Sequence, residues 1–62
     1  MNIELFKKAL GASGLSRNAL AKKADVNLST VSRLADGQNL NVTADTIKKL
    51  EKTLGLKKGD LL

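Results

Sequence analysis

The sequence predicts an all-α fold, a compact bundle of four to five short helices. Apolar residues recur every three or four positions along most of the 62 residues, as on the buried face of a helix. An Asn, Ser or Thr precedes each of these segments, and glycine, aspartate or the pair Asp-Gly follows it, as expected for helix ends. No segment alternates apolar and polar residues over the length of a strand between turn signals. The short intervals between the helical segments indicate a single domain over residues 1–62.

Four capping residues divide the chain into helices. A short polar side chain before a helix accepts a hydrogen bond from an amide of the first turn, and the residues placed to do so are Asn2, Ser16, Asn27 and Thr43. The expected helices cover residues 3–10, 17–23, 28–35 and 44–54. Residues 56–62 are expected to add a fifth turn or short helix, with Leu61 and Leu62 as apolar anchors.

The predicted core takes one face of each helix. In chain order, the residues that form these faces are Ile3, Phe6 and Leu10, then Leu20, Ala21 and Ala24, then Val31 and Leu34, and finally Ile47, Leu50 and Leu54. Val26 is expected to be a further buried anchor just before the third helix. A domain of this size buries only about 60% of the surface of its unfolded chain, so each of these positions matters for stability.

Composition excludes several classes of protein. The chain contains no Cys and no His, which rules out disulfides and Cys/His zinc sites. Its six carboxylates are scattered, and it has no glycine-rich phosphate-binding loop. Because catalysis at neutral pH usually recruits such groups, we expect no enzyme activity, no catalytic residue, no metal, no cofactor and no small-molecule substrate.

Charge and hydropathy indicate the partner and the compartment. The chain has 11 Lys plus Arg against 6 Asp plus Glu, a formal net charge of +5 that favours a polyanionic partner such as nucleic acid. Many small basic proteins are nevertheless simply soluble. No apolar run approaches the roughly 20 residues needed to span a bilayer, and no secretory signal is evident, so a cytoplasmic protein is expected. A membrane-surface peptide is disfavoured, because the apolar faces are shared among several helices.

Residues 15–37 contain the most specific pattern, two short helices joined by a tight turn. Ala21 is small where the two helices must approach each other closely. Asp25 occupies the turn, where Asp tolerates a left-handed backbone better than most residues. Val31 and Leu34 face inward from the second helix, which leaves its polar residues free to meet a groove.

This pattern resembles the lambda repressor-like helix-turn-helix family, which includes the phage repressors, the Cro proteins and the XRE-type regulators. The resemblance continues through residues 43–50 and the segment Leu54-Gly55-Leu56, so that it covers nearly the whole chain. It implies a central helix-turn-helix within the bundle and a DNA-binding domain over residues 1–62. It also implies that the helix over residues 27–35 enters the major groove while the helix before it lies across the DNA backbone.

The resemblance implies base or groove-wall contacts for the outward residues of this helix, namely Asn27, Leu28, Ser29, Ser32 and Arg33. Arg33 can donate two hydrogen bonds to a guanine edge, with a phosphate contact or a solvated position as alternatives. Ser29 and Ser32 can donate to a base or a phosphate, or remain ordinary surface residues. Leu28 departs from the polar or basic residue that the family often has there. It can pack against a thymine methyl, fill an apolar gap or contact another subunit.

Phosphate contacts are implied at the start of the first helix of the unit and in the loop after the second, for Arg17, Asn18, Gln38, Asn39 and Asn41. Amides of the helix terminus would assist Arg17, for which a plain surface charge is the alternative. Gln38 departs from the family, which commonly has a basic residue there, and Asp25 replaces the glycine usual in the turn.

The resulting prediction is sequence-specific binding of a double-stranded DNA operator by a transcriptional repressor or regulator. Family members usually act as two-fold dimers, which implies a homodimer on DNA, associated with the nucleoid while bound. The alternative is a protein-interaction module of the same fold, antitoxin-like or adaptor-like, with little or no DNA binding. Leu28 and Gln38 favour this alternative, whereas the positive charge and Arg33 favour DNA.

Overall fold

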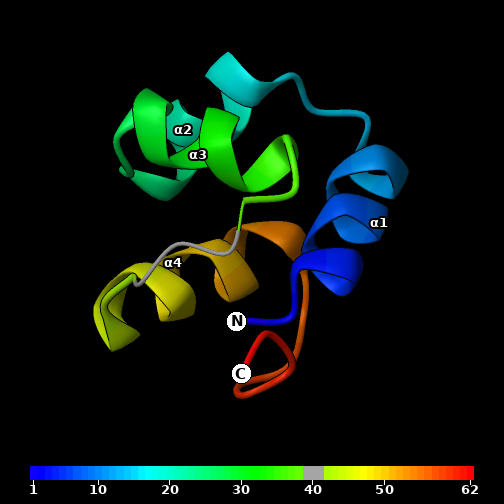
Figure 1. Cartoon of the computed structure of the whole chain (residues 1–62), viewed down its shortest axis with the longest axis vertical. Coiled ribbons are helices and arrows are strands. Elements are labelled where there is room, and N and C mark those ends of the chain that lie inside the picture. The colour runs from blue at the N-terminus through cyan, green and yellow to red at the C-terminus, as the bar shows by residue number, and fades with distance from the viewer. Residues whose placement is uncertain (39–41) are drawn as a thin grey trace.

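The computed structural model describes residues 1–38 and 42–62, which form four helices and no strand. The helices are α1 (Ile3–Ser13), α2 (Arg17–Ala24), α3 (Leu28–Ala35) and α4 (Ala44–Leu54). In Figure 1, α2 and α3 lie together, α1 flanks them, and α4 lies below them. The predicted all-α bundle is confirmed, with four helices where four to five were expected. None of these helices is long and apolar enough to cross a membrane.

Each helix begins after the capping residue that the sequence predicts. The side-chain oxygens of these residues accept backbone N–H groups at 2.9–3.2 Å, Asn2 from Leu5, Ser16 from Ala19, Asn27 from Ser29 and Thr43 from Thr46. The first amides of a helix have no partner within it, so a cap of this kind stabilises the helix by about 1 kcal/mol. Two of the four helices, α2 and α3, have only 8 residues each, and the caps hold their short first turns in place.

The first two helices end later than the sequence predicts. α1 continues through Gly11 and ends at Ser13, because it is Gly14, at φ 72°, that takes the left-handed conformation. Gly11 inside the helix costs about 0.5–1 kcal/mol relative to alanine. The cost is small enough for the packing of α1 to outweigh it. α2 includes Ala24, and the left-handed turn follows at Asp25.

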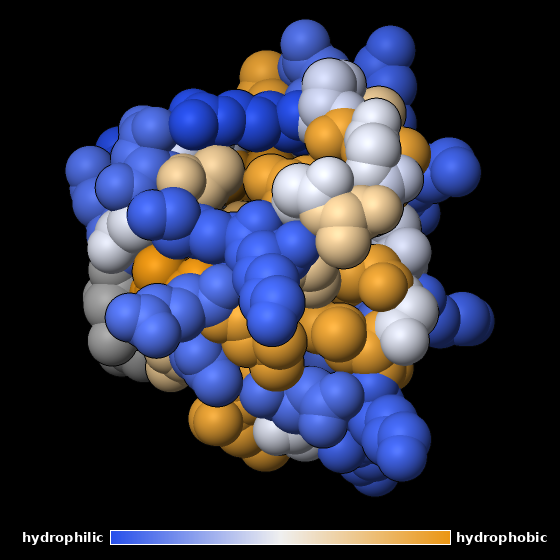
Figure 2. Space-filling model, turned by 90° about the vertical axis from the view of Figure 1, so that its right-hand side faces the viewer, coloured by the Kyte–Doolittle hydropathy of each residue, from blue (hydrophilic) through white to orange (hydrophobic). Residues whose placement is uncertain are grey.

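The core lies where the helices meet. Its fully buried side chains are Phe6, Leu20, Val31, Leu34, Leu50 and Leu61, joined by Ala21, Ala24 and Ile47. Burying one large apolar side chain stabilises a protein by about 1.5–3 kcal/mol. The predicted core residues Ile3, Leu10, Val26 and Leu54 are only partly buried at its edge. Figure 2, viewed from the side that α1 occupies in Figure 1, shows apolar surface between charged side chains.

Residues 56–62 form turns and no fifth helix. Leu61 is the apolar anchor that the sequence predicts, but Leu62 is 78% exposed, and its prediction as an anchor was wrong. The turn that directs one side chain inward directs the next one outward. Glu51, only 3% exposed, accepts the Leu61 N–H at 3.0 Å. The Leu61 carbonyl accepts the Asn2 N–H at 2.6 Å, which brings the two ends of the chain together (Figure 1).

Candidate functional site

The turn between α2 and α3 is fixed by backbone hydrogen bonds around Asp25. As predicted, Asp25 has a left-handed backbone (φ 55°, ψ 48°), the one such non-glycine residue in the described part of the chain. Its N–H donates to the Lys22 carbonyl at 3.3 Å, and the Val26 N–H donates to the Ala21 carbonyl at 3.0 Å. This pattern closes α2 as a Schellman motif does. The cap at Asn27 then starts α3 directly after the turn.

α2 and α3 pack against each other through small and apolar side chains. Ala21 and Ala24 of α2 are buried, and their methyl groups permit a close approach of the two helices. Val31 and Leu34 of α3 are fully buried, which confirms the inward pair that the sequence predicts. The opposite side of α3 is therefore left to solvent.

The outward side of α3 carries the residues for which base contacts are predicted. Asn27, Leu28, Ser29 and Arg33 are exposed, and Ser32 is half-buried. Leu28 is 44% exposed, so it fills no apolar gap within the chain, and one of its three predicted roles is removed. The side-chain oxygen of Asn27 already accepts the Ser29 N–H at 2.9 Å, which leaves its NH₂ group to meet another partner.

An unpredicted cluster of polar side chains joins the start of α2 to the end of α3. The Arg17 guanidinium donates from Nη2 to Asp36 Oδ1 at 2.9 Å, and from Nη1 to Ser32 Oγ at 3.1 Å and the Ser32 carbonyl at 3.5 Å. The Arg17 and Asp36 side chains are 45% and 54% exposed, so their ion pair contributes at most about 1 kcal/mol to stability. No local pattern signals this pair, because 19 positions separate the two residues.

This cluster, formed by Arg17, Ser32 and Asp36, changes how the predicted contacts are related. Arg17, predicted to bind a phosphate, and Ser32, predicted to meet a base, are hydrogen-bonded to each other in the free protein. A guanidinium carries five N–H donors, so Arg17 retains some for a second acceptor. The Ser32 hydroxyl, while it accepts from Arg17, still has its own hydrogen to donate.

The remaining predicted contacts lie at the ends of the two helices. Asn18 is exposed in the first turn of α2. Gln38 is exposed after α3, and its N–H donates to the Arg33 carbonyl at 3.0 Å. Asn39 and Asn41 lie outside the described residues.

Lys7 is a cation of α1 that the sequence does not single out from the other lysines. Its Nζ atom lies 3.8 Å from the position that a Cβ atom would take on Gly37. α1 therefore brings this charge to Gly37, in the turn that follows α3. Within the described residues, no group of three His, Cys, Asp or Glu side chains could hold a metal ion.

Comparison with protein families identifies a match over most of the chain. A family model described as helix-turn-helix matches residues 6–61, a span that includes α2, the turn at Asp25 and α3. Comparison with curated proteins and with solved structures gave no significant match.

Proposed function

Since the chain belongs to the lambda repressor-like (XRE) helix-turn-helix family of DNA-binding regulators, we propose that it reads double-stranded DNA sequence-specifically and represses or otherwise regulates transcription. The observation that carries this proposal is the two-sided character of α3. Val31 and Leu34 hold the helix from beneath, while Leu28, Ser29 and Arg33 project from the other side. A helix presented in this way fits the major groove, which is about 12 Å wide.

Base readout is assigned to the outward side of α3. In this arrangement Arg33 donates two hydrogen bonds to the O6 and N7 atoms of a guanine. Leu28 packs against a thymine methyl group, which suits an exposed aliphatic side chain in the first turn of the helix. Ser29, Ser32 and the free NH₂ group of Asn27 supply short donors that reach bases or the groove walls.

Phosphate contacts are assigned to the start of α2 and to the segment after α3. Arg17, held by Asp36 and Ser32, offers its remaining N–H groups to a phosphate beside the groove. Asn18 adds an amide donor next to it. Gln38 takes the same role after α3, and we extend it to Asn39 and Asn41 on the basis of their amide side chains alone.

A single unit of this size buries little DNA surface, so we propose that two copies bind as a homodimer. Two-fold dimers of such units recognise half-sites about one turn of DNA, or roughly 34 Å, apart. The operator is then an approximate palindrome. The proposed compartment is the cytoplasm, with the protein on the nucleoid while it is bound to DNA.

Selection from random duplex DNA tests this function. The full chain is incubated with a random library at two salt concentrations, and the retained duplexes are sequenced. The proposed function predicts an enriched motif with two-fold symmetry at both concentrations, with affinity falling steeply as salt increases. Retention without any enriched motif would indicate purely electrostatic binding and would contradict sequence-specific readout.

The exposure of Leu28 supports one alternative function, a protein-interaction module of the same fold. An aliphatic side chain that is 44% exposed on an otherwise polar helix can also anchor a partner protein. The two functions differ in the selection experiment, because a protein-interaction module retains little or no duplex DNA.

A further inference from the structure

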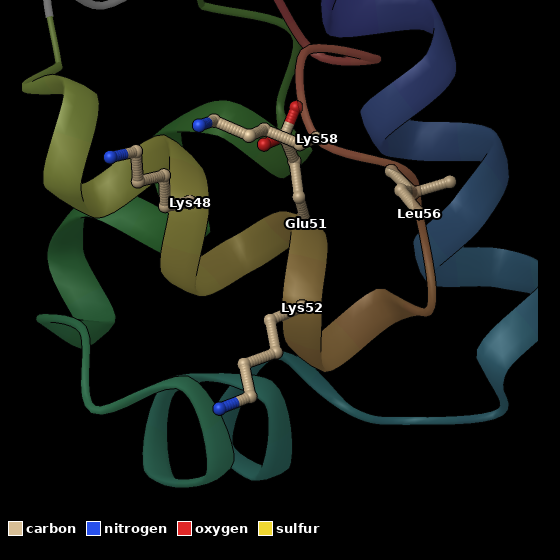
Figure 3. Close-up of a pocket in the computed structure, with 5 residues that line it drawn as sticks. All are labelled: Lys48, Glu51, Lys52, Leu56 and Lys58. Atoms are coloured by element: carbon tan, nitrogen blue, oxygen red, sulfur yellow. The ribbon is translucent and has the colours of Figure 1, made fainter.

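α4 and the segment after it carry a concentration of lysines apart from the outward side of α3. Lys48, Lys52 and Lys58 line a shallow hollow together with Glu51 and Leu56 (Figure 3). A neighbouring hollow between α2 and α4 is lined by Lys23, Ala24, Lys49, Lys52 and Thr53. Lys52 lines both hollows, and the five lysines that line them, at positions 23, 48, 49, 52 and 58, are called here the lysine surface.

Two acidic side chains, Asp45 and Glu51, accompany the five lysines of the lysine surface. Asp45 pairs with Lys49 at 3.4 Å, and among the described residues this is the only ion pair that involves a residue of the lysine surface. Glu51 lies at the bottom of the first hollow, but it is only 3% exposed and its carboxylate accepts the Leu61 N–H. This hydrogen bond holds the end of the chain, and the carboxylate still offsets one lysine charge. Most of the positive charge of the lysine surface remains available to a ligand.

The helix dipole accounts for only part of this arrangement. Lys52 lies in the last turn of α4, and Lys23 in the last turn of α2, where a cation complements the helix dipole. Lys48 gains nothing from that effect, and it stands four positions before Lys52, a spacing at which like charges destabilise a helix. Figure 3 shows that the Lys48 and Lys58 side chains extend to the same side of α4, although Lys58 comes from the segment after the helix. This repeated juxtaposition of cations indicates an anionic ligand.

We propose that the lysine surface binds the phosphates of a second segment of duplex DNA, so that the protein joins two duplexes. The bridging rests on the proposed function, in which α3 holds the first duplex. Lysines suit this second role because their ammonium groups are flexible point charges that contact phosphates without reading bases. Several such contacts give binding that depends strongly on salt and little on sequence.

The two surfaces are separated along α2. At its start, Arg17 is bonded to Ser32 and Asp36 of α3. At its other end, Lys23 lines the hollow shared with α4. Lys23 comes six residues after Arg17 in α2, so the lysine surface begins about 9 Å along the helix axis from Arg17.

A two-duplex capture experiment tests the proposal. A duplex enriched by selection is immobilised, the full chain is bound to it, and a fluorescent duplex of unrelated sequence is added. The test variant is K48Q/K52Q/K58Q, and the matched control is K8Q/K22Q/K57Q, which removes three lysines that line neither hollow. We expect the test variant to bind the immobilised duplex within about threefold of the parent but to capture at least tenfold less of the second duplex. The control variant should retain most of the capture.

The outcomes separate a second DNA-binding surface from a general effect of charge and from bridging by a dimer. Equal loss of capture in both triple variants would show a general effect of charge and overturn the proposal. Capture that persists in K48Q/K52Q/K58Q would show bridging by two α3 helices of a dimer, which also overturns it. If K48Q/K52Q/K58Q loses as much affinity for the immobilised duplex as it loses capture of the second, the lysines contact the first duplex, and the proposal is overturned. A further outcome is that the parent captures no second duplex and yet binds polyglutamate, with K48Q/K52Q/K58Q losing that binding. This result would indicate an acidic protein partner and overturn the proposal.

A second arm does not depend on α3. In the R33A background, unrelated duplex DNA is titrated by fluorescence anisotropy at several salt concentrations. We expect binding to persist, and the added K48Q/K52Q/K58Q changes to reduce the slope of log affinity against log salt by about 0.9 for every phosphate that the protein no longer neutralises. An unchanged slope would overturn the second surface even if selection finds no operator. A reduced slope, together with a selection that enriches no operator, would support DNA binding by the lysine surface and contradict the proposed function.

Discussion

The outward side of α3 and the lysine surface differ in how their polar groups are held. On the α3 side, Asn27 accepts the Ser29 N–H, and Ser32 accepts from Arg17, which is itself paired with Asp36. On the lysine surface the cations are dense, and within the described part of the chain only Lys49 forms an ion pair with an acid. Groups with fixed positions suit discrimination between bases, whereas mobile charges suit attraction to any phosphate backbone. The two proposals accordingly give specificity to the α3 side and sequence-independent affinity to the lysine surface.

The support beneath α3 gives the largest expected effect. Val31→Asp places an unpaired charge in the fully buried core and should cost at least ~3 kcal/mol, comparable to the whole stability of a domain this small. Thermal unfolding followed by circular dichroism measures the change. Ser29→Asp adds the same charge to the exposed side of the same helix and should keep the fold while weakening DNA binding. Equal melting temperatures for the two variants would contradict the two-sided description of α3.

The local features of this fold could be predicted from the sequence because each depends on a few consecutive residues. The caps at Asn2, Ser16, Asn27 and Thr43 follow from side chains that bond amides two or three positions later. The left-handed turn at Asp25 follows in the same way from its residue type and its place between two apolar segments. The end of α1 could not be predicted so well, since Gly11 and Gly14 offer two stops three residues apart.

The next expected effect concerns base readout. Arg33→Ala should weaken binding to the selected operator by about 1–3 kcal/mol and relax the preference at one base pair of each half-site. Binding to unrelated duplexes should fall much less, because it relies on phosphate contacts. Anisotropy titrations with operator and unrelated duplexes measure both. If the loss is the same for every sequence, Arg33 contacts a phosphate and does not read a base.

An effect of similar size, here on the free energy of unfolding, is expected for Glu51, which lies beneath the lysine surface. Glu51→Ala leaves the buried Leu61 N–H without an acceptor and should lower the free energy of unfolding by about 1–3 kcal/mol. Glu51→Gln retains an oxygen at the same place and serves as the control. Urea unfolding of both variants provides the comparison. Equal losses for the two would mean that the carboxylate charge, and not the hydrogen bond, holds the end of the chain.

The site was less predictable than the fold because its main contacts are long-range. Arg17 and Asp36 could be recognised separately as a helix-start cation and a turn residue, but their pairing depends on the angle at which α2 meets α3. Glu51 likewise appears among the polar residues outside the apolar stripe of α4. Its burial results from Leu61 folding back over it, 10 positions later. Neither contact has a signature within one helical segment.

The smallest expected effect, at most about 1 kcal/mol, comes from the Asp36 carboxylate. Asp36→Asn removes a negative charge from the proposed DNA side and frees Arg17 from its ion pair, so affinity for every duplex should rise by up to about fivefold. Asp45→Asn makes the same change of charge at the Asp45–Lys49 pair, next to the lysine surface. In single-duplex titrations Asp36→Asn should raise the affinity more than Asp45→Asn does. In two-duplex capture Asp45→Asn should raise the amount of captured second duplex more than Asp36→Asn does. Identical effects in both assays would mean that the two surfaces contact DNA as one, and the division of roles between α3 and α4 would have to be abandoned.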